Sequence, residues 1–270
     1  MTPLNASPFW PHKATQAARV RGAALAQLWL HRNQWRLPLP RALMRRERDT
    51  QLADLMPAVM VISLMVGALL FVTLPSTLGD AYLSALATLW PVWVIQAAPI
   101  AAAQVLAMQR APTLALELSQ RHSRGEFDAL ANLNANPAAY PCVPILAAHA
   151  SVTAAASFLL IALTLILGVL SAFVLAVGDL RQSIDAVFSL VSPLQWLRSL
   201  VTAALLGLAC SLATMLYAWP GTQTATGATG GVTAHRLGMQ TMIVSSLSTI
   251  AAALALNWVI GLLGFLKWWP

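Results

Sequence analysis

Apolar residues gather into five long windows that contain no Lys, Arg, Asp or Glu. The windows cover residues 55–79, 81–109, 145–178, 199–219 and 237–266. An α-helix needs about 20 residues to cross the ~30 Å hydrocarbon core of a bilayer, so each window is long enough to span it. The second window contains Pro91 and Pro99, which predict a kink or break in that helix. The pattern therefore predicts an all-α integral membrane domain, residues 55–270, with about five transmembrane helices.

The composition also indicates a membrane protein. Of 270 residues, 58% are hydrophobic and 9% are charged, and the mean hydropathy is +0.69. This balance exceeds what the single core of a soluble domain requires. Lys267, Trp268 and Trp269 are typical of residues that anchor a helix at the membrane surface. The two cysteines, Cys142 and Cys210, fit no metal or redox spacing, so we expect them to be packing residues.

Positive charge is concentrated before the first apolar window. Residues 1–54 hold nine Lys/Arg against three acidic residues, which gives +6 of the net +7. The positive-inside rule then predicts a cytoplasmic N-terminus. With five spans, thirteen Lys/Arg lie on the cytoplasmic side and three, Arg181, Arg198 and Lys267, on the other. Arg-rich segments also bind nucleic acid, but beside so much apolar sequence we expect no nucleic-acid partner.

The basic segment 1–54 is expected to form an arm at the membrane surface. No small-residue cleavage site follows a clean apolar core, so the arm is expected to be retained rather than cleaved as a signal peptide. Val20, Ala24 and Leu28 recur every fourth residue and predict an interfacial helix that is broken at Pro38. A solvated basic arm is the alternative interpretation.

Sequence motifs for catalysis are absent. A P-loop ends in Gly-Lys followed by Ser or Thr, and neither of the two lysines, Lys13 and Lys267, ends such a motif. The Gly- and Thr-rich stretch 220–231 therefore reads as a connector. His149 stands alone among apolar residues, and we expect it to hydrogen-bond between helices rather than to bind a metal. We expect no enzymatic activity, metal site or cofactor in this chain.

One charged stretch, RGEFDALANLNANP at 124–137, interrupts the apolar sequence after the second window. It predicts a short amphipathic helix that ends before Pro137. Phe127 and Leu130 are three residues apart and share a face. That face fits an apolar groove on a partner, while Glu126 and Asp128 would pair with basic residues at its rim. The alternative is a solvated loop helix that touches no partner.

The same stretch resembles the coupling segment of MlaE-type (YrbE-type) permeases, the membrane subunits of ABC transporters that work with MCE proteins in lipid trafficking. The family pattern E-E-I-D-A-L, then D-P, then P-R, is similar to the residues at 125–130, 136–137 and 144–145. Its E-L-G-P and A-G-R-x-G-S-A-x-x-A-E-x-G resemble 96–99 and 107–119, and its G-V-x-x-A-T-T-R resembles 231–236. With the basic arm and the five-span order, the resemblance covers residues 15–266.

Four positions depart from the family pattern. Gln109 stands where the family has arginine, although Arg110 is adjacent, and Asn136 replaces aspartate. Ile145 replaces the arginine of the P-R pair, and Gly238 lies near the place of a missing second arginine before the last span. These departures are consistent with a specialised subunit that pairs with a less divergent permease.

The resemblance implies a permease that moves phospholipid or a related hydrophobic molecule between the bacterial inner membrane and a periplasmic MCE protein. It further implies a second permease copy, as a homodimer or a heterodimer, and a cytoplasmic ABC ATPase that binds ATP and Mg. The implied ATPase-coupling residues are Glu126, Phe127, Asp128, Ala129 and Leu130. A non-ABC carrier and a structural membrane scaffold are the alternative functions.

The absence of charge inside the windows favours an amphiphilic substrate that enters from the bilayer, because ions or sugars need polar groups along their path. A lipid head group would still need a few polar contacts. Candidate residues for the substrate cavity lie on the second window: Gln96, Pro99, Gln104, Gln109 and Glu117. For each glutamine, a hydrogen bond to a neighbouring helix is the alternative role.

Overall fold

The computed structural model describes residues 38–133, 139–175, 180–218 and 231–266, and in these ranges the chain is helical without any β-strand. The α-helices are α2 (Pro38–Ala68), α3 (Leu74–Leu78), α4 (Tyr82–Val92), α5 (Ala98–Ser123), α6 (Glu126–Asn132), α7 (Ala139–Val174), α8 (Leu180–Leu190), α9 (Pro193–Ala218) and α10 (Gly231–Leu266). Two π-helical turns, Leu69–Thr73 and Trp93–Ala97, and a 3-10 turn, Gly79–Ala81, connect neighbouring helices. The predicted all-α fold is confirmed.

Within the described residues, five segments are long and apolar enough to cross a membrane, which confirms the predicted number. They are Ala42–Leu78, Tyr82–Ser123, Cys142–Val174, Pro193–Ala218 and Leu237–Val259. The first is longer than the sequence pattern predicts, because α2 begins at Pro38 and continues without a break past residue 54. A proline is tolerated in the first turn of a helix, where its missing N–H has no intrahelical acceptor. The predicted surface helix around Val20 lies outside the described residues.

Proline causes the irregular backbone in the first two spans. Pro99 lacks an N–H, and its ring would clash with the carbonyl of Ile95 in a regular α-helix. Ile95 lies within the second π-helical turn, where the hydrogen-bond spacing widens from four to five residues. The same relation holds between Pro75 and Phe71, which lies in the first π-helical turn. Of the irregularity predicted for the second span, the structure shows a π-helical turn before Pro99, whereas Pro91 lies inside the α-helix α4.

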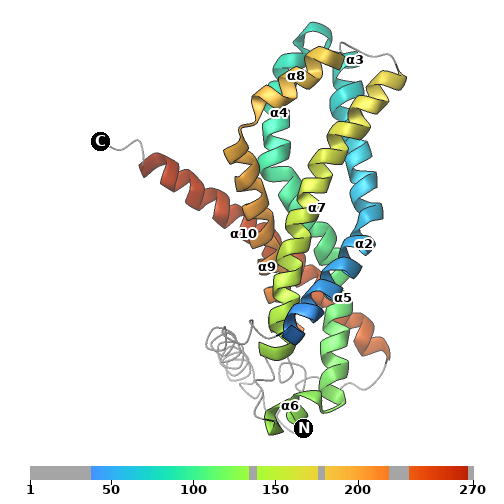
Figure 1. The fold of residues 1–270 in the computed structure, drawn as a ribbon, viewed down its shortest axis with the longest axis vertical. Coiled ribbons are helices and arrows are strands. Elements are labelled where there is room, and N and C mark those ends of the chain that lie inside the picture. Colours follow the sequence, from blue (N-terminus) through green and yellow to red (C-terminus); the bar gives the residue numbers. More distant parts are fainter. Residues whose placement is uncertain (1–37, 134–138, 176–179, 219–230, 267–270) are drawn as a thin grey trace, which may run out of the picture.

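Close helix packing holds the bundle together (Figure 1). α2 makes its most extensive contacts with α7, α7 packs against α9, and α5 contacts α7, α9 and α10. A Cβ added to Gly67 of α2 would lie 2.8 Å from the backbone nitrogen of Gly168 in α7, so these two helices approach as closely as small residues permit. Phe71 and Trp90 pack edge to face beside them, with ring centroids 6.3 Å apart.

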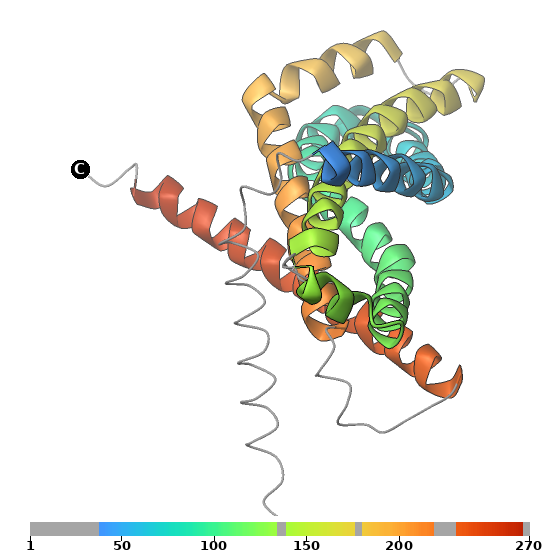
Figure 2. The same cartoon turned by 60° about the horizontal axis from the view of Figure 1, so that its bottom comes forward.

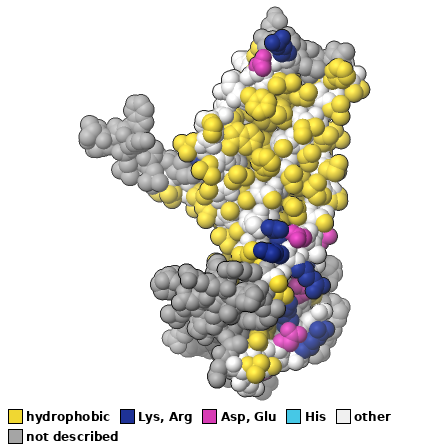
Figure 3. Space-filling model, viewed as in Figure 1, with side chains coloured by type: hydrophobic (Ala, Val, Ile, Leu, Met, Phe, Trp, Pro, Cys, Tyr) yellow, Lys and Arg dark blue, Asp and Glu magenta, His cyan; other side chains and the backbone are white. Residues whose placement is uncertain are grey.

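The outer surface of the bundle is largely apolar. Large hydrophobic side chains on different helices are strongly exposed, including Met65 (68%), Phe173 (70%) and Leu247 (61%). Figure 3 shows hydrophobic side chains over the middle of the visible face and charged side chains toward its two ends. Water disfavours such a surface, whereas the acyl chains of a bilayer match it. The chain is a multi-pass membrane protein.

Two short helices mark the opposite ends of the bundle (Figure 1), which we call the α6 end and the α8 end. α8 is absent from the sequence-based predictions. It packs against α4, and the Tyr82 hydroxyl donates a hydrogen bond to Ser183 Oγ at 3.3 Å. Ser183 and Val187, four residues apart, are buried, whereas Asp185 is exposed. This spacing is the signal by which α8 could have been recognised.

Candidate functional site

A charged cavity of about 440 Å³ lies at the α6 end, between α2, α5 and α7. Its lining residues are Leu43, Arg46, Glu47, Thr50 and Asp54 of α2, Arg110, Glu117 and Arg121 of α5, and Pro144 and Ile145 of α7. Six of these ten side chains are charged. The cavity therefore brings acidic and basic side chains of α2 and α5 close together beside two residues of α7.

Arg110 connects α2 and α5 across this cavity. Its guanidinium forms an ion pair with Glu47, and its Nη1 lies 3.3 Å from Glu117 Oε1. Gln51 Nε2 donates a further hydrogen bond to Glu47 Oε1 at 2.7 Å. The Arg110 and Glu47 side chains are only 20% and 23% exposed, so water screens them less than it screens a surface pair. The network therefore fixes the position of α2 relative to α5.

His149 lies deeper in the bundle, and it is 2% exposed. Its Nδ1 and the hydroxyl of Ser211 form a hydrogen bond that joins α7 to α9. The predicted hydrogen-bonding role of His149 is thus confirmed. Cys142 and Cys210 are both buried and free of disulfides, in agreement with their predicted packing role. In the described part of the chain, no group of three or more His, Cys, Asp or Glu is placed to hold a metal.

α6 is held to the bundle by Phe127, which is 8% exposed. This ring packs in a cluster from the ends of α5, α7 and α9, whose other buried members are Leu114, Ala115, Leu118, Cys142, Ile145, Met215 and Ala218. The His122 ring lies beside it, with centroids 6.2 Å apart. The Phe127 side chain therefore connects α6 to the ends of three membrane-spanning helices.

The outward side of α6 is mainly charged. Its exposed residues include Glu126, Asp128 and Ala129, while Leu130 is half-buried. Leu133, just after the helix, is 77% exposed. The short helix predicted within residues 124–137 is present as α6, Glu126–Asn132, but Phe127 turns toward the bundle instead of forming an outward apolar edge with Leu130. The predicted stop at Pro137 lies outside the described residues.

The five predicted cavity residues do not lie together. Gln96, in the π-helical turn, and Gln109 are exposed, whereas Pro99 is buried. Gln104 Nε2 donates a hydrogen bond to the Ser246 carbonyl of α10 at 3.1 Å, which is the alternative role considered for the glutamines. Glu117 lines the charged cavity. The structure thus assigns these side chains to different surroundings along one helix.

The motif residue Glu117 and several positions at or beside the departures from the family pattern lie closer together. Arg110, Glu117 and Ile145 all line the charged cavity, and a Cβ on Gly238 would meet Pro112 at 3.4 Å. Asn136 lies outside the described residues. No local sequence pattern identifies Glu47 as a partner of Arg110, since 63 positions separate the two residues. The available signal was that Glu47 is an acidic residue within a run of arginines.

The model of one protein family, described as Permease MlaE, matches residues 46–259. No curated protein matches the chain. The matched range contains α6, nine of the ten residues that line the charged cavity and nearly all of the five apolar spans. The resemblance drawn from the short motifs is thereby confirmed over most of the sequence.

Proposed function

The chain belongs to the MlaE permease family, and on that premise we propose that it carries phospholipid or a related hydrophobic molecule between the bacterial inner membrane and a periplasmic MCE partner. Family membership makes it a membrane permease of an ABC lipid transporter. Partner ATPase subunits bind ATP with Mg and hydrolyse it, and this chain is the transport subunit.

In this proposal the α6 end faces the cytoplasm. The arginine-rich start of α2 and Arg110, Arg121 and Arg124 of the α5–α6 region all belong to that end, which agrees with the positive-inside rule. α6 is then within reach of a cytoplasmic ATPase, and α8 is on the side of the MCE protein. A second permease copy completes the transport path, and the motif departures at Gln109 and Ile145 favour a related, less divergent copy.

The burial of Phe127 among the ends of α5, α7 and α9 carries the proposal. An ATPase that binds the charged outer side of α6 moves this helix, together with Phe127, when the ATPase changes conformation. The Phe127 ring then displaces the ends of α5, α7 and α9, which it contacts. The Arg110–Glu47 pair extends this displacement to α2. Different nucleotide states of the ATPase then favour different arrangements of the same helices, which is what alternating lipid access requires.

Reconstitution tests the proposed function. The permease, its copurifying ATPase and the MCE protein are placed in vesicles, and transfer of a fluorescent phospholipid to the MCE protein is measured with and without ATP. We expect transfer that requires both ATP and the ATPase. Equal transfer without the ATPase would identify a non-ABC carrier, and a stable assembly without any transfer would identify a scaffold.

A further inference from the structure

Helices α9 and α10 are tied together in one half of the bundle and separate in the other. Toward the α6 end, the Tyr217 hydroxyl donates to Gln240 Oε1 at 3.1 Å, and Cys210 Sγ lies 3.0 Å from Ser245 Oγ. Toward the α8 end, the C-terminal part of α10 leaves the other helices in both views of the fold (Figures 1 and 2). The divergence opens space between the two helices.

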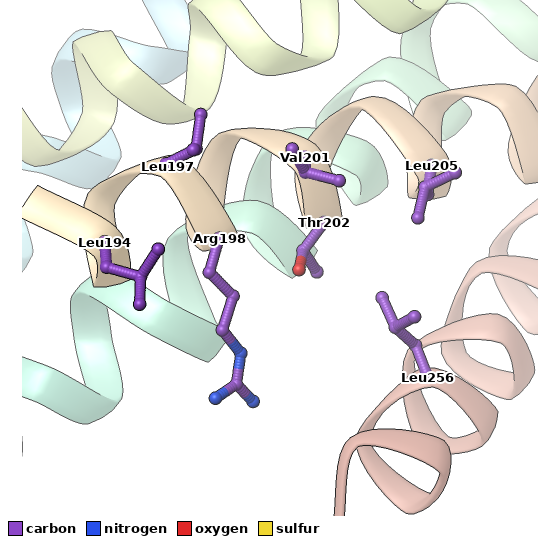
Figure 4. A pocket seen from close by; sticks show the side chains of 7 residues that line it. All are labelled: Leu194, Leu197, Arg198, Val201, Thr202, Leu205 and Leu256. Carbon is purple, nitrogen blue, oxygen red and sulfur yellow. The ribbon is translucent and has the colours of Figure 1, made fainter. Parts of the chain in front are cut away.

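Two neighbouring hollows lie in this space, of about 370 Å³ and about 350 Å³, and we call them together the α9–α10 trough. Leu205 of α9 and Leu256 of α10 line both hollows, which places the hollows next to each other. All the other lining side chains are Leu, Val or Ala, except Arg198 and Thr202. Figure 4 shows these two polar side chains and Leu205 pointing from α9 toward the side on which Leu256 faces them.

Arg198 places a positive charge in this apolar trough, and no described residue compensates it. No acidic residue lines either hollow, and among the described residues no ion pair or side-chain hydrogen bond of Arg198 is formed. Its Nε is buried without a hydrogen-bond partner. Thr202 follows four residues later on the same helix face and adds a hydroxyl. The part of the trough around Arg198 and Thr202 therefore offers hydrogen-bond donors to an anion, and the Leu, Val and Ala side chains offer apolar contacts.

We propose that the α9–α10 trough binds one acyl chain of an anionic phospholipid whose phosphate pairs with Arg198. A guanidinium fork matches phosphate oxygens, and a site of low dielectric strengthens the pair. Arg198 lies five residues after the start of α9, about 7 Å along the helix axis, where a head group meets acyl chains. From Arg198 to Leu205 the lining extends about 10 Å along α9, which accommodates the first part of an extended acyl chain.

The lipid occupant is a transported substrate only if the proposed function holds, whereas the binding site stands on the geometry of the trough. Three other occupants give different results. Bulk lipid would fill the trough without regard to charge. A free fatty acid would present a carboxylate to Arg198. A second copy of the chain would cover the trough with protein.

Photo-crosslinking of the full-length protein in phosphatidylcholine vesicles distinguishes these occupants. The probe is phosphatidylglycerol with a diazirine on one acyl chain, and labelled peptides are mapped by mass spectrometry. We expect labelling of α9 between residues 194 and 206 and of α10 between 252 and 259. Arg198→Gln should lower this labelling about tenfold. A tenfold change corresponds to about 1.4 kcal/mol, and a hydrogen bond to a charged group contributes at least about that much. Arg198→Lys should retain part of it.

Matched controls separate the trough from its surroundings. Leu256→Trp is the test variant and adds a bulky ring inside the trough. Leu254→Trp is its control and adds the same ring at an exposed position of α10. Arg181→Gln is the control for Arg198→Gln and removes the same charge at the α8 end. We expect Leu256→Trp to abolish labelling and both controls to leave it unchanged. Equal labelling of wild-type protein and Arg198→Gln would overturn the proposal in favour of bulk lipid.

Competition and crosslinking between copies decide the remaining outcomes. Unlabelled phosphatidylglycerol should displace the probe, and stronger displacement by oleic acid would overturn the phospholipid assignment. Disulfide-linked dimers of Leu256→Cys would assign the trough to a second copy. The labelling experiment contains no ATPase or MCE protein, so it is independent of the reconstituted transport assay. Selective labelling in the first experiment together with no transport in the second would refute only the proposed function. Active transport with unselective labelling would refute only the trough site.

Discussion

Arg110 of α5 pairs with Glu47 of α2 across 63 positions of sequence. The pair joins the arginine-rich start of the first span to the helix that leads into α6. Glu117, 3.3 Å from the same guanidinium, holds Arg110 from the side nearer α6. The ion pair therefore links the α5–α6 region to α2, and the apolar contacts of Phe127 link α6 to α5, α7 and α9.

Glu47→Gln is expected to destabilise the bundle and to weaken transport. The substitution keeps the shape of the side chain but removes the charge that faces Arg110, and Glu117 compensates only in part. We expect a loss of about 1–3 kcal/mol, the range for removing one partner of a charged hydrogen bond. The melting temperature of the detergent-solubilised protein and ATP-dependent lipid transfer measure the two effects.

Asp49→Asn is the matched control, because Asp49 is 65% exposed and pairs only with its neighbour Arg48 among the described residues. It should leave both measurements near the wild-type values. The exchange Glu47→Arg with Arg110→Glu should restore part of the stability lost in the single variants. A Glu47→Gln protein as stable and active as Asp49→Asn would contradict a structural role for the pair.

Reversing the exposed carboxylates of α6 is expected to release the ATPase. Glu126→Lys with Asp128→Lys places two positive charges on the surface that the proposal assigns to ATPase docking, and charges of the wrong sign cost affinity at such a rim. Pulldown of the ATPase by the permease is the measurement. Asp185→Lys reverses an exposed carboxylate at the opposite end and should not change recovery; unaltered recovery with the double variant would remove α6 from the interface.

Phe127→Ala is expected to uncouple ATP hydrolysis from transport while the ATPase stays bound. The ring is buried and provides the apolar contact between α6 and three spans, whereas the charged docking surface remains. We expect a fall in stability of up to about 3–5 kcal/mol, as for other buried Phe→Ala changes. Lipid transferred per ATP hydrolysed should fall several-fold.

Leu133→Ala provides the comparison, because Leu133 lies beside α6 and is 77% exposed. Its ratio of transport to hydrolysis should remain that of the wild type. Phe127→Leu should recover part of the coupling by refilling the space. If Phe127→Ala kept the wild-type ratio at a temperature where the variant is folded, the ring would be a packing residue only.

Much of the fold was predictable because a bilayer imposes a simple rule on sequence. The five spans and the irregular second span follow from charge-free windows and from proline chemistry, both of which act locally. α8 was missed because its contacts with α4 depend on residues a hundred positions away, such as Tyr82 for Ser183. The amphipathic pattern of residues 180–190 was its local signal.

The candidate site was predictable in its elements but not in its connections. The helix at residues 126–130 follows from its charge pattern, but the direction of Phe127 depends on how α5, α7 and α9 end. Pairing of Arg110 with Glu47 requires the packing of α2 beside α5, which no local pattern contains. Gln104 looked like a cavity residue on α5 alone, and only the position of α10 shows that Ser246 accepts its hydrogen bond.

Gly67→Ala is expected to force α2 away from α7. The new Cβ would lie 2.7 Å from the Thr164 carbonyl oxygen and 2.8 Å from the Gly168 nitrogen, and both are backbone atoms that cannot rotate away. Overpacking of this kind costs about 1–3 kcal/mol. Thermal unfolding in detergent should show a lower melting temperature, whereas Ala53→Val, at an exposed position of α2, should show none. Equal stability of the two variants would mean that the helices separate without cost.

The two glutamines of the second span should respond differently to substitution. Gln104 already bonds the Ser246 carbonyl, so Gln104→Met removes a contact between α5 and α10. Such bonds average about 0.6 kcal/mol in membrane proteins, and we expect a small loss of stability with lipid transfer largely retained. Gln96 is exposed in the π-helical turn, and irregular backbone at membrane depth is tolerated where it faces protein or a cavity.

Gln96→Trp is therefore expected to reduce ATP-dependent lipid transfer several-fold, because the added ring would enter the transport path. An exposed polar side chain within a span is unfavourable against acyl chains, and a path that passes a lipid head group removes that penalty. Leu170→Trp, at a 54% exposed position of α7, introduces the same ring and should leave transfer unchanged. Fluorescent phospholipid transfer in reconstituted vesicles measures both variants at matched protein incorporation. Full activity of Gln96→Trp would place Gln96 against bulk lipid and exclude this face of the second span from the path.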